Sequence, residues 1–218
     1  MRGDPVRATV LNMKILPNAD PAMLARLEVP EGHVALGLIT TDIDDVSYAA
    51  LDEATKKADV QVAYARSMYA GSANANTKFA GEFIGILSGP SPSDVRSGLN
   101  AMVEYIENDS CFYSANDDDS VVYFNQTISR TGSYLSKMAE VPEGTAMAYL
   151  IAPPLEAMYA MDFALKAADV EMKVFYGPPT ETNFAGGLLV GEQSACRAAC
   201  IAFAEAVEYA AANPQVLT

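Results

Sequence analysis

The sequence is poor in the residues that most often carry out catalysis. It has one histidine, His33, and three cysteines in 218 residues. A Ser-His-Asp or Cys-His arrangement would therefore depend on His33 alone. The sequence also lacks a glycine-rich phosphate loop, an HExxH motif and spaced pairs of cysteines. These absences favour a protein that is not an enzyme.

The number and spacing of the cysteines indicate the redox state of the compartment in which the chain functions. An odd number of cysteines without framework spacing fits a reducing compartment. Cys196 and Cys200 lie one helical turn apart, but two thiols without further ligands make a poor zinc site. We expect both to be small buried residues.

Long apolar runs and excess positive charge are missing too. Glu205 and Glu208 interrupt the most hydrophobic stretch, so no apolar run reaches the roughly 18 residues of a membrane span. The N-terminal residues lack the apolar core of a signal peptide. The net charge of −14 argues against nucleic acid and anionic membranes as partners and favours small cationic or neutral ones. We expect a cytoplasmic protein that binds neither nucleic acid nor membrane.

The sequence does contain an internal duplication. The tetrapeptide VPEG occurs at Val29–Gly32 and again at Val141–Gly144, a separation of 112 residues. Further along, "AALDEATKKADV" aligns with "AMDFALKAADV" at a separation of 110, and "FAG" recurs at a separation of 105. The period is too long for a solenoid repeat, and it indicates that a whole domain of about 100 residues was duplicated.

Hydrophobic periodicity predicts the same order of elements in both copies: strand, helix, strand, helix, strand, strand, helix. In the first copy a strand is expected near 8–16 and a short helix near 21–27. The "SPSD" sequence then opens the last helix with Ser and Asp caps and an early proline. Each copy is predicted to be a compact α+β domain, with a mainly antiparallel sheet and helices packed on one face.

Polar residues at the ends of these elements are the candidates for function. Asp42, Asp44 and Asp45 precede the first long helix, and Glu82 interrupts an apolar strand. The aspartates are also typical of a helix N-terminus, where each is worth about 0.3 to 1 kcal/mol. Glu82 is equally well explained as an outward-facing strand residue. From the residues alone both explanations stay open.

Longer stretches resemble a known family over nearly the whole chain. Among them are "DDVSYAALDEATKKADV", "MAYLIAPPLEAMYAMDFALKAADVEM", "PPTETNF" and "QSACRAACIAFAEAV". They are similar to the tandem bacterial microcompartment shell proteins of ethanolamine utilisation. The resemblance implies two circularly permuted microcompartment domains, which are ferredoxin-like, at residues 1–112 and 113–218. It also implies a homotrimer shaped as a pseudohexamer, which tiles the shell together with other shell proteins.

The resemblance further implies gated pores that let small molecules such as ethanolamine cross. The loops Tyr69–Lys78 and Gly177–Thr182 differ in length between the copies and are the expected gate. No cofactor is required, although zinc or another divalent metal is implied at the acidic pair Asp45 and Glu82. The ligand-binding pore residues carried over from the family are Asp44, Asp45, Glu82, Phe112, Thr182, Asn183 and Phe184.

With this resemblance, Asp45 and Glu82 are interpreted as pore residues, while Asp44 remains equally suited to capping the helix. An alternative function is a soluble ligand-sensing or enzymatic protein built from duplicated ferredoxin-like domains, which fold alone does not exclude.

Overall fold

The computed structural model describes residues 1–67, 83–178 and 184–215. Within them the chain forms two compact units. The N-terminal unit comprises Arg7–Ser110 and Gly132–Leu135. The C-terminal unit comprises Met1–Val6, Cys111–Thr131 and Ser136–Thr218. The predicted domains, 1–112 and 113–218, divide the chain by its sequence repeat and stay a prediction.

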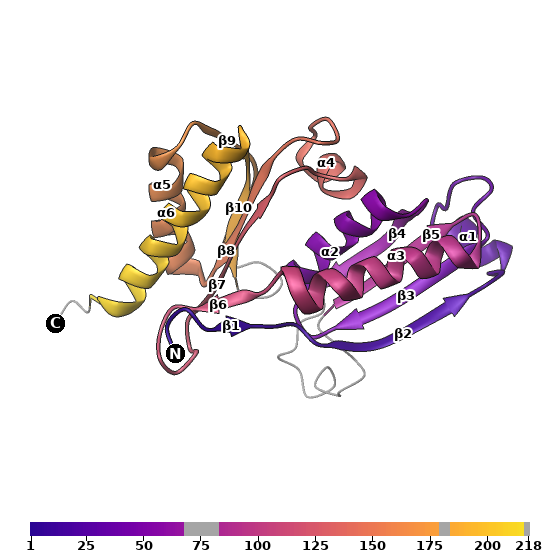
Figure 1. Cartoon of the computed structure of the whole chain (residues 1–218), viewed down its shortest axis with the longest axis horizontal. Helices are drawn as coiled ribbons and strands as arrows, with labels where there is room; N and C mark the ends of the chain where they lie inside the picture. The colour runs from indigo at the N-terminus through magenta and orange to yellow at the C-terminus, as the bar shows by residue number, and fades with distance from the viewer. Residues whose placement is uncertain (68–82, 179–183, 216–218) are drawn as a thin grey trace. The chain divides into compact units, whose positions relative to one another are not determined.

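The N-terminal unit is built on a four-stranded antiparallel sheet (Figure 1). Its strand order is β2 (Val10–Leu16), β3 (Ala35–Thr41), β5 (Phe83–Gly89) and β4 (Gln61–Ser67). Its helices are α1 (Pro21–Arg26), α2 (Asp44–Lys57) and α3 (Pro92–Glu104), and α3 continues as a π-helix, η1 (Tyr105–Asp109). As the capping residues predicted, α3 begins with Ser91, whose hydroxyl accepts from the Asp94 N–H.

Helices cover both faces of this sheet, not one. Alternate residues of a strand point to opposite faces. Gly37 of β3 faces α3, because a Cβ there would lie 2.4 Å from a Val95 methyl group. Its neighbour Leu36 packs instead with Leu24 and Leu27, at and just after α1. The prediction of helices on one face is therefore wrong for α1, whose short apolar stripe covers the opposite side.

The C-terminal unit repeats this plan. Its sheet has the order β1 (Pro5–Val6), β6 (Phe112–Ser114), β7 (Val122–Ile128), β8 (Met147–Ala152), β10 (Ala185–Gly191) and β9 (Val170–Tyr176). The last four strands follow the same order as β2, β3, β5 and β4. The helices are α4 (Ser133–Ala139), α5 (Pro154–Ala167) and α6 (Gln193–Ala212), with α5 packed against α6.

The repeated VPEG sequence has one structure in both copies. Glu28 and Glu140, directly before it, have φ of 52° and 53°, and the glycines that end it, Gly32 and Gly144, have φ of 89° and 85°. The Val29 N–H donates to the Leu24 carbonyl and the Glu28 N–H to that of Ala25. This is the Schellman pattern that ends a helix. The duplicated tetrapeptide is therefore a duplicated helix stop and turn before a central strand.

Candidate functional site

Two of the predicted pore residues, Asp44 and Asp45, form the first turn of α2. Both are buried, with 7% of each residue exposed. Ile43 stands at the N-cap position, and its side chain is apolar, so the two acids supply the negative charge that a helix N-terminus favours. Burial sets them apart from ordinary surface acids, because a buried carboxylate needs partners.

Asp44 has such partners. Its Oδ1 accepts from the Asp45 N–H at 2.9 Å, and its Oδ2 accepts from the Ser67 hydroxyl at 2.7 Å. Ser67 ends β4, and its hydroxyl lies 2.8 Å from the Tyr48 hydroxyl. Because Ser67 donates to Asp44, Tyr48 is left to donate to Ser67. The result is a polar chain from α2 to the end of β4.

Burial raises the pKa of Asp44, and the hydrogen bonds from Ser67 and from backbone N–H groups oppose that rise. The pKa of Asp44 is raised overall. Asp44 therefore holds a proton more readily than an exposed aspartate, while retaining two donors aimed at its oxygens.

Aromatic rings border this cluster. Tyr48 meets Phe83 edge to face, with ring centroids 5.0 Å apart, and stacks on Tyr134 at 6.2 Å. Phe83 is the first residue of β5, and it pairs with Thr41 and Ser67 on the two neighbouring strands. Glu82, the other predicted acid, lies outside the described residues, so its role as partner of Asp45 stays a prediction.

Phe112 and Phe184 lie together in the C-terminal unit. Their rings meet edge to face with centroids 5.9 Å apart, and Phe112 also stacks on Phe124 at 5.2 Å. Phe112 is only 4% exposed. A ligand contact there would therefore use its backbone, since the ring is enclosed by other aromatic residues. Thr182 and Asn183 fall outside the described residues, and their roles stay predictions.

Sequence reasoning did not single out Ser67 or Tyr48. Tyr48 follows Asp44 by four residues on one helix, which places both on one face, so this spacing was a usable signal. Ser67 had none, because it reaches Asp44 only through the pairing of β4 beside β5. His33 is accounted for structurally, since its Nδ1 lies 3.0 Å from the Ser88 hydroxyl.

A third buried carboxylate, Asp52, has a structural role. It is 0% exposed and accepts from the Gly132 N–H at 2.7 Å and from the Leu135 N–H at 2.9 Å. These donors are among the N–H groups at the start of α4, which have no partner inside their helix. Asp52 therefore caps α4, whose preceding residue, Gly132, lies 80 residues later in the sequence.

Metal-binding groups are sparse in the part of the chain that is described. Within it, no three His, Cys, Asp or Glu residues gather closely enough to hold a metal ion. Cys111, Cys196 and Cys200 are buried free thiols, as expected for the latter two. The proposed metal pair includes Glu82, so the described residues leave that prediction untested.

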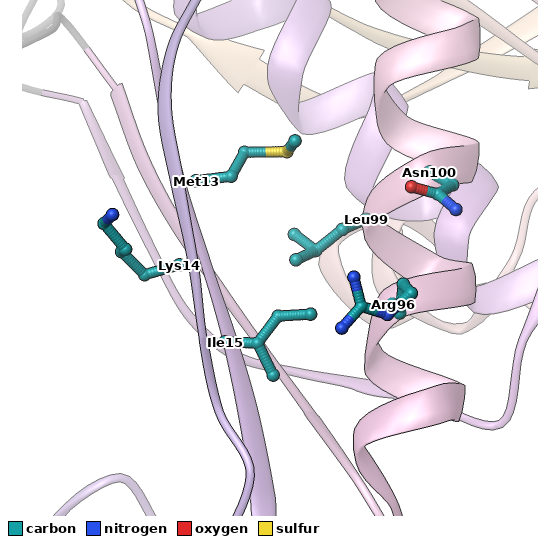
Figure 2. Close-up of a pocket in the computed structure, with 6 residues that line it drawn as sticks. All are labelled: Met13, Lys14, Ile15, Arg96, Leu99 and Asn100. Carbon is teal, nitrogen blue, oxygen red and sulfur yellow. The ribbon is translucent and has the colours of Figure 1, made fainter.

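Each repeat also has a hollow between its first strand and its last helix. In the N-terminal unit, Met13 and Ile15 of β2 point toward Leu99 of α3, and Lys14 points away (Figure 2). This hollow has a volume of about 300 Å³, and a second, of about 460 Å³, lies between β7 and α6. One arginine lines each, Arg96 and Arg197. Among the described residues, none of those predicted for the pore lines either hollow.

Comparison with known proteins agrees with this duplicated architecture. A family model described as the BMC domain matches residues 35–116. The bacterial microcompartment shell protein EutL of Clostridium perfringens (strain 13 / Type A) is 64% identical over 98% of this chain and 99% of its own length. The EutL of Escherichia coli (strain K12) is 47% identical over 97% and 96%. The crystal structure of the ethanolamine utilization protein EutL from Leptotrichia buccalis C-1013-b is 63% identical, covers 100% of both chains and has a TM-score of 0.97.

Fold and comparisons together define a tandem protein of bacterial microcompartment domains. More narrowly, the chain belongs to the EutL family of bacterial microcompartment shell proteins. The predicted α+β tandem fold and the resemblance stated from the sequence are confirmed. The alternative of a ligand-sensing or enzymatic protein loses its support, because the family is a structural one. In the described ranges, every helix is too short or too polar to cross a membrane.

Proposed function

We propose that three copies of this chain form a pseudohexameric tile in the shell of an ethanolamine-utilisation microcompartment. The repeated strand order supports the proposal most directly, because two equivalent domains per chain and three chains supply the six wedges of a hexagonal tile. Duplication also lets the two copies differ, as the buried Asp52 and its exposed counterpart Asp162 do. Other shell proteins of the same compartment are the proposed neighbours, within the cytoplasm.

Electron microscopy of concentrated protein tests the tile. A tile has complementary edges and should extend into flat sheets with hexagonal spacing. Discrete particles that never associate edge to edge, over a wide range of concentration and salt, would contradict a tiling role.

We propose that the tile passes small solutes and that an ammonium compound, ethanolamine foremost, binds at Asp44, Asp45 and Glu82. A carboxylate holds an ammonium through charge-assisted hydrogen bonds worth about 1.5 to 3 kcal/mol each. The burial of Asp44 and Asp45 supports this, since both carboxylates are already withdrawn from bulk water. The remaining proposed contacts are Phe112, Thr182, Asn183 and Phe184.

Such a site should bind weakly. Two or three contacts, less the cost of ordering the ligand, correspond to a Kd nearer millimolar than nanomolar. Weak binding suits a pore, because the solute must also leave. Titration calorimetry with ethanolamine should show a large loss of affinity in the double variant Asp45→Asn and Glu82→Gln. Equal affinity in the two proteins would exclude this site.

The same acids are the proposed holders of a divalent metal. Asp45 and Glu82 would supply two oxygen ligands, a donor set that suits hard ions better than zinc. Water or a second copy of the chain would have to complete the shell. A bound metal would add positive charge at the pore and compete with an ammonium for the same carboxylates.

We further propose that the loops Tyr69–Lys78 and Gly177–Thr182 move between closed and open arrangements. The first is made largely of small polar residues, which bury little apolar surface, and Pro178 restricts the second. A ligand held by Thr182 and Asn183 would favour one arrangement over the other. Hydrogen exchange should slow in both loops when ethanolamine saturates the protein. Unchanged exchange would contradict a coupled gate.

A further inference from the structure

The two hollows between a first strand and a last helix lie at corresponding places in the two repeats. Each is lined by three consecutive strand residues, 13–15 of β2 and 125–127 of β7, which are 112 residues apart like the two VPEG sequences. The buried positions of the two helices correspond at a separation of 101. They are Val95, Gly98, Leu99 and Met102 on α3, and Cys196, Ala199, Cys200 and Phe203 on α6. The two hollows are therefore one feature of the duplicated domain.

An arginine stands at the same position in both hollows. Arg96 of α3 and Arg197 of α6 are also 101 residues apart, and each lines its hollow. The lining residue one helical turn further on differs, because it is Asn100 in the first repeat and Ile201 in the second. The arginine is thus retained where its surroundings have diverged.

The charges around these arginines are unusual for this chain. It has 28 acidic residues against 14 Lys and Arg, so carboxylates outnumber cations two to one. Among the described residues that line either hollow, however, none is Asp or Glu. Neither Arg96 nor Arg197 has a hydrogen-bond acceptor or an ion-pair partner within the described ranges. Each hollow therefore offers an unneutralised guanidinium to an anion from solution.

The hollow at Arg96 has an apolar floor. In Figure 2, Met13 and Ile15 point from β2 toward Leu99 of α3, and the Arg96 side chain reaches from α3 toward β2. Leu99 is 2% and Met13 38% exposed, so the floor is closed at the helix and open at the strand. Lys14 points away, which leaves Arg96 as the cation of this hollow. The volume of about 300 Å³ lies at the lower end of the range typical of small-molecule sites.

We propose that this hollow binds a small monocarboxylate with a short apolar tail. The Arg96 guanidinium presents two parallel N–H groups, which match the two oxygens of a carboxylate. Asn100 lines the hollow four residues further on, on the same helix face, and its amide can donate to one of these oxygens. The tail lies against Met13 and Ile15, where its apolar surface leaves water.

This site is separate from the proposed tile and its pore. All of its lining residues belong to the N-terminal unit, so binding does not depend on how many chains assemble. Its ligand also carries the opposite charge to the ammonium proposed for Asp44 and Asp45. Failure of either proposal therefore leaves the other standing.

The second hollow provides a control within the same chain. Its floor is polar, because Asn125 and Thr127 take the positions that Met13 and Ile15 have in the first hollow. Such a floor gives an apolar tail little surface to cover. Arg197 should therefore not hold this class of ligand.

Methionine-methyl NMR of the full chain tests the site, with sodium butyrate as the probe and chloride exchanged to keep the ionic strength constant. The Met13 methyl resonance, assigned as the one missing in Met13→Leu, should shift and saturate in the millimolar range. In Arg96→Gln the same shift should need at least about tenfold more butyrate. Arg197→Gln is the matched control and should titrate like the unaltered chain. The other methionine resonances show that each variant folds.

Butanol and inorganic phosphate separate the two parts of the site, because butanol has a tail without charge and phosphate has charge without a tail. Both should bind more weakly than butyrate. Three results in the variants and the unaltered chain would overturn the proposal: a Met13 shift that grows without saturating, equal affinity in Arg96→Gln, or an equal loss in Arg197→Gln. Butanol or phosphate that binds as tightly as butyrate would overturn it as well.

Discussion

Asp44 and Asp52 lie eight residues apart on one helix, both buried, and their partners decide what each does. Asp52 accepts two backbone N–H groups that have no other partner, so it is a structural cap. Asp44 accepts from one backbone N–H and from the hydroxyl of Ser67. The Ser67 hydroxyl can rotate when the Asp44 carboxylate gains another partner. A cation can therefore bind Asp44 without removing the cap of a helix, whereas a cation at Asp52 would displace the N–H donors of α4.

The raised pKa of Asp44 gives a prediction with a definite sign. In the folded state it binds a proton at a higher pH than in the unfolded state, so the folded protein holds more protons in that window. Its contribution to stability therefore grows as the pH falls from its raised pKa to the ordinary value of 3.8. Asp44→Asn should remove this part of the pH dependence.

Asp44→Asn should also preserve the network at neutral pH, because the amide can donate to Ser67 while Ser67 donates to Tyr48. Urea unfolding from pH 7 to pH 4 measures the effect. The variant should be at least as stable as the unaltered chain at pH 7, and the advantage should shrink at lower pH. A variant that loses stability at pH 7 and gains it at pH 4 would contradict this interpretation of burial.

Asp52 and Asp162 form a natural matched pair for a second prediction. Asp52→Ala leaves the Gly132 and Leu135 N–H groups without an acceptor, which should cost about 2 to 4 kcal/mol of stability. Asp162→Ala removes an exposed ion pair with Lys166 and should cost less than about 0.5 kcal/mol. Urea midpoints of the two variants, measured side by side, test the assignment. Similar losses in both would show that Asp52 is not a cap.

Residue roles were predictable from the sequence only where local spacing carried them. The acids Asp42, Asp44 and Asp45 were visible in the sequence as a cluster at the start of a helix. The role of Asp52 was not, since its donors lie 80 and 83 residues away. Asp42 likewise accepts from the Thr9 N–H at 2.5 Å, across 33 residues. Long-range contacts of this kind leave no periodic signal.

At the scale of elements, the repeated turn explains why the same tetrapeptide appears twice. Each central strand, β3 and β8, must be entered directly from the end of a short helix. The Schellman ending and the following glycine in the left-handed region supply that reversal. Both copies, however, use glutamate at the first left-handed position.

A non-glycine residue there carries strain of about 1 to 2 kcal/mol. We therefore predict that Glu140→Gly stabilises the protein by about 0.5 to 1 kcal/mol, after the entropic cost of glycine is subtracted. The control is Glu143→Gly, three residues on, where φ is not positive and glycine should only destabilise. Thermal unfolding of both variants gives the comparison, and a lower Tm for Glu140→Gly would contradict the assignment.

The order of the long elements was predictable, and all seven in each copy are present. Periodicity identified them because each has a buried stripe of its own. Three short elements were not predicted: β1, β6 and η1. Two-residue and three-residue strands are too short for a pattern, and β1 pairs with β6 across more than 100 residues. The position of α1 on the opposite face also followed from packing rather than from local sequence.

For the protein as a whole, duplication lets corresponding helices differ in exposure. Asp45 and Ala49 of α2 are buried, whereas their counterparts on α5, Leu155 and Tyr159, are exposed. Exposed aromatic residues extend from α5 to α6, where Tyr159, Phe163 and Tyr209 form one cluster with ring centroids 4.8 Å and 6.2 Å apart. A chain that ended its assembly as a monomer would leave this surface in water.

The mass of the protein in solution tests whether three chains assemble into one tile. One chain has a mass of 23.2 kDa, so sedimentation equilibrium at micromolar concentration should give three times that mass, about 70 kDa, independent of concentration above the dissociation range. Three chains with two domains each supply the six wedges of a hexagonal tile. A monomer or a dimer that persists from micromolar to millimolar concentration would contradict a trimeric tile.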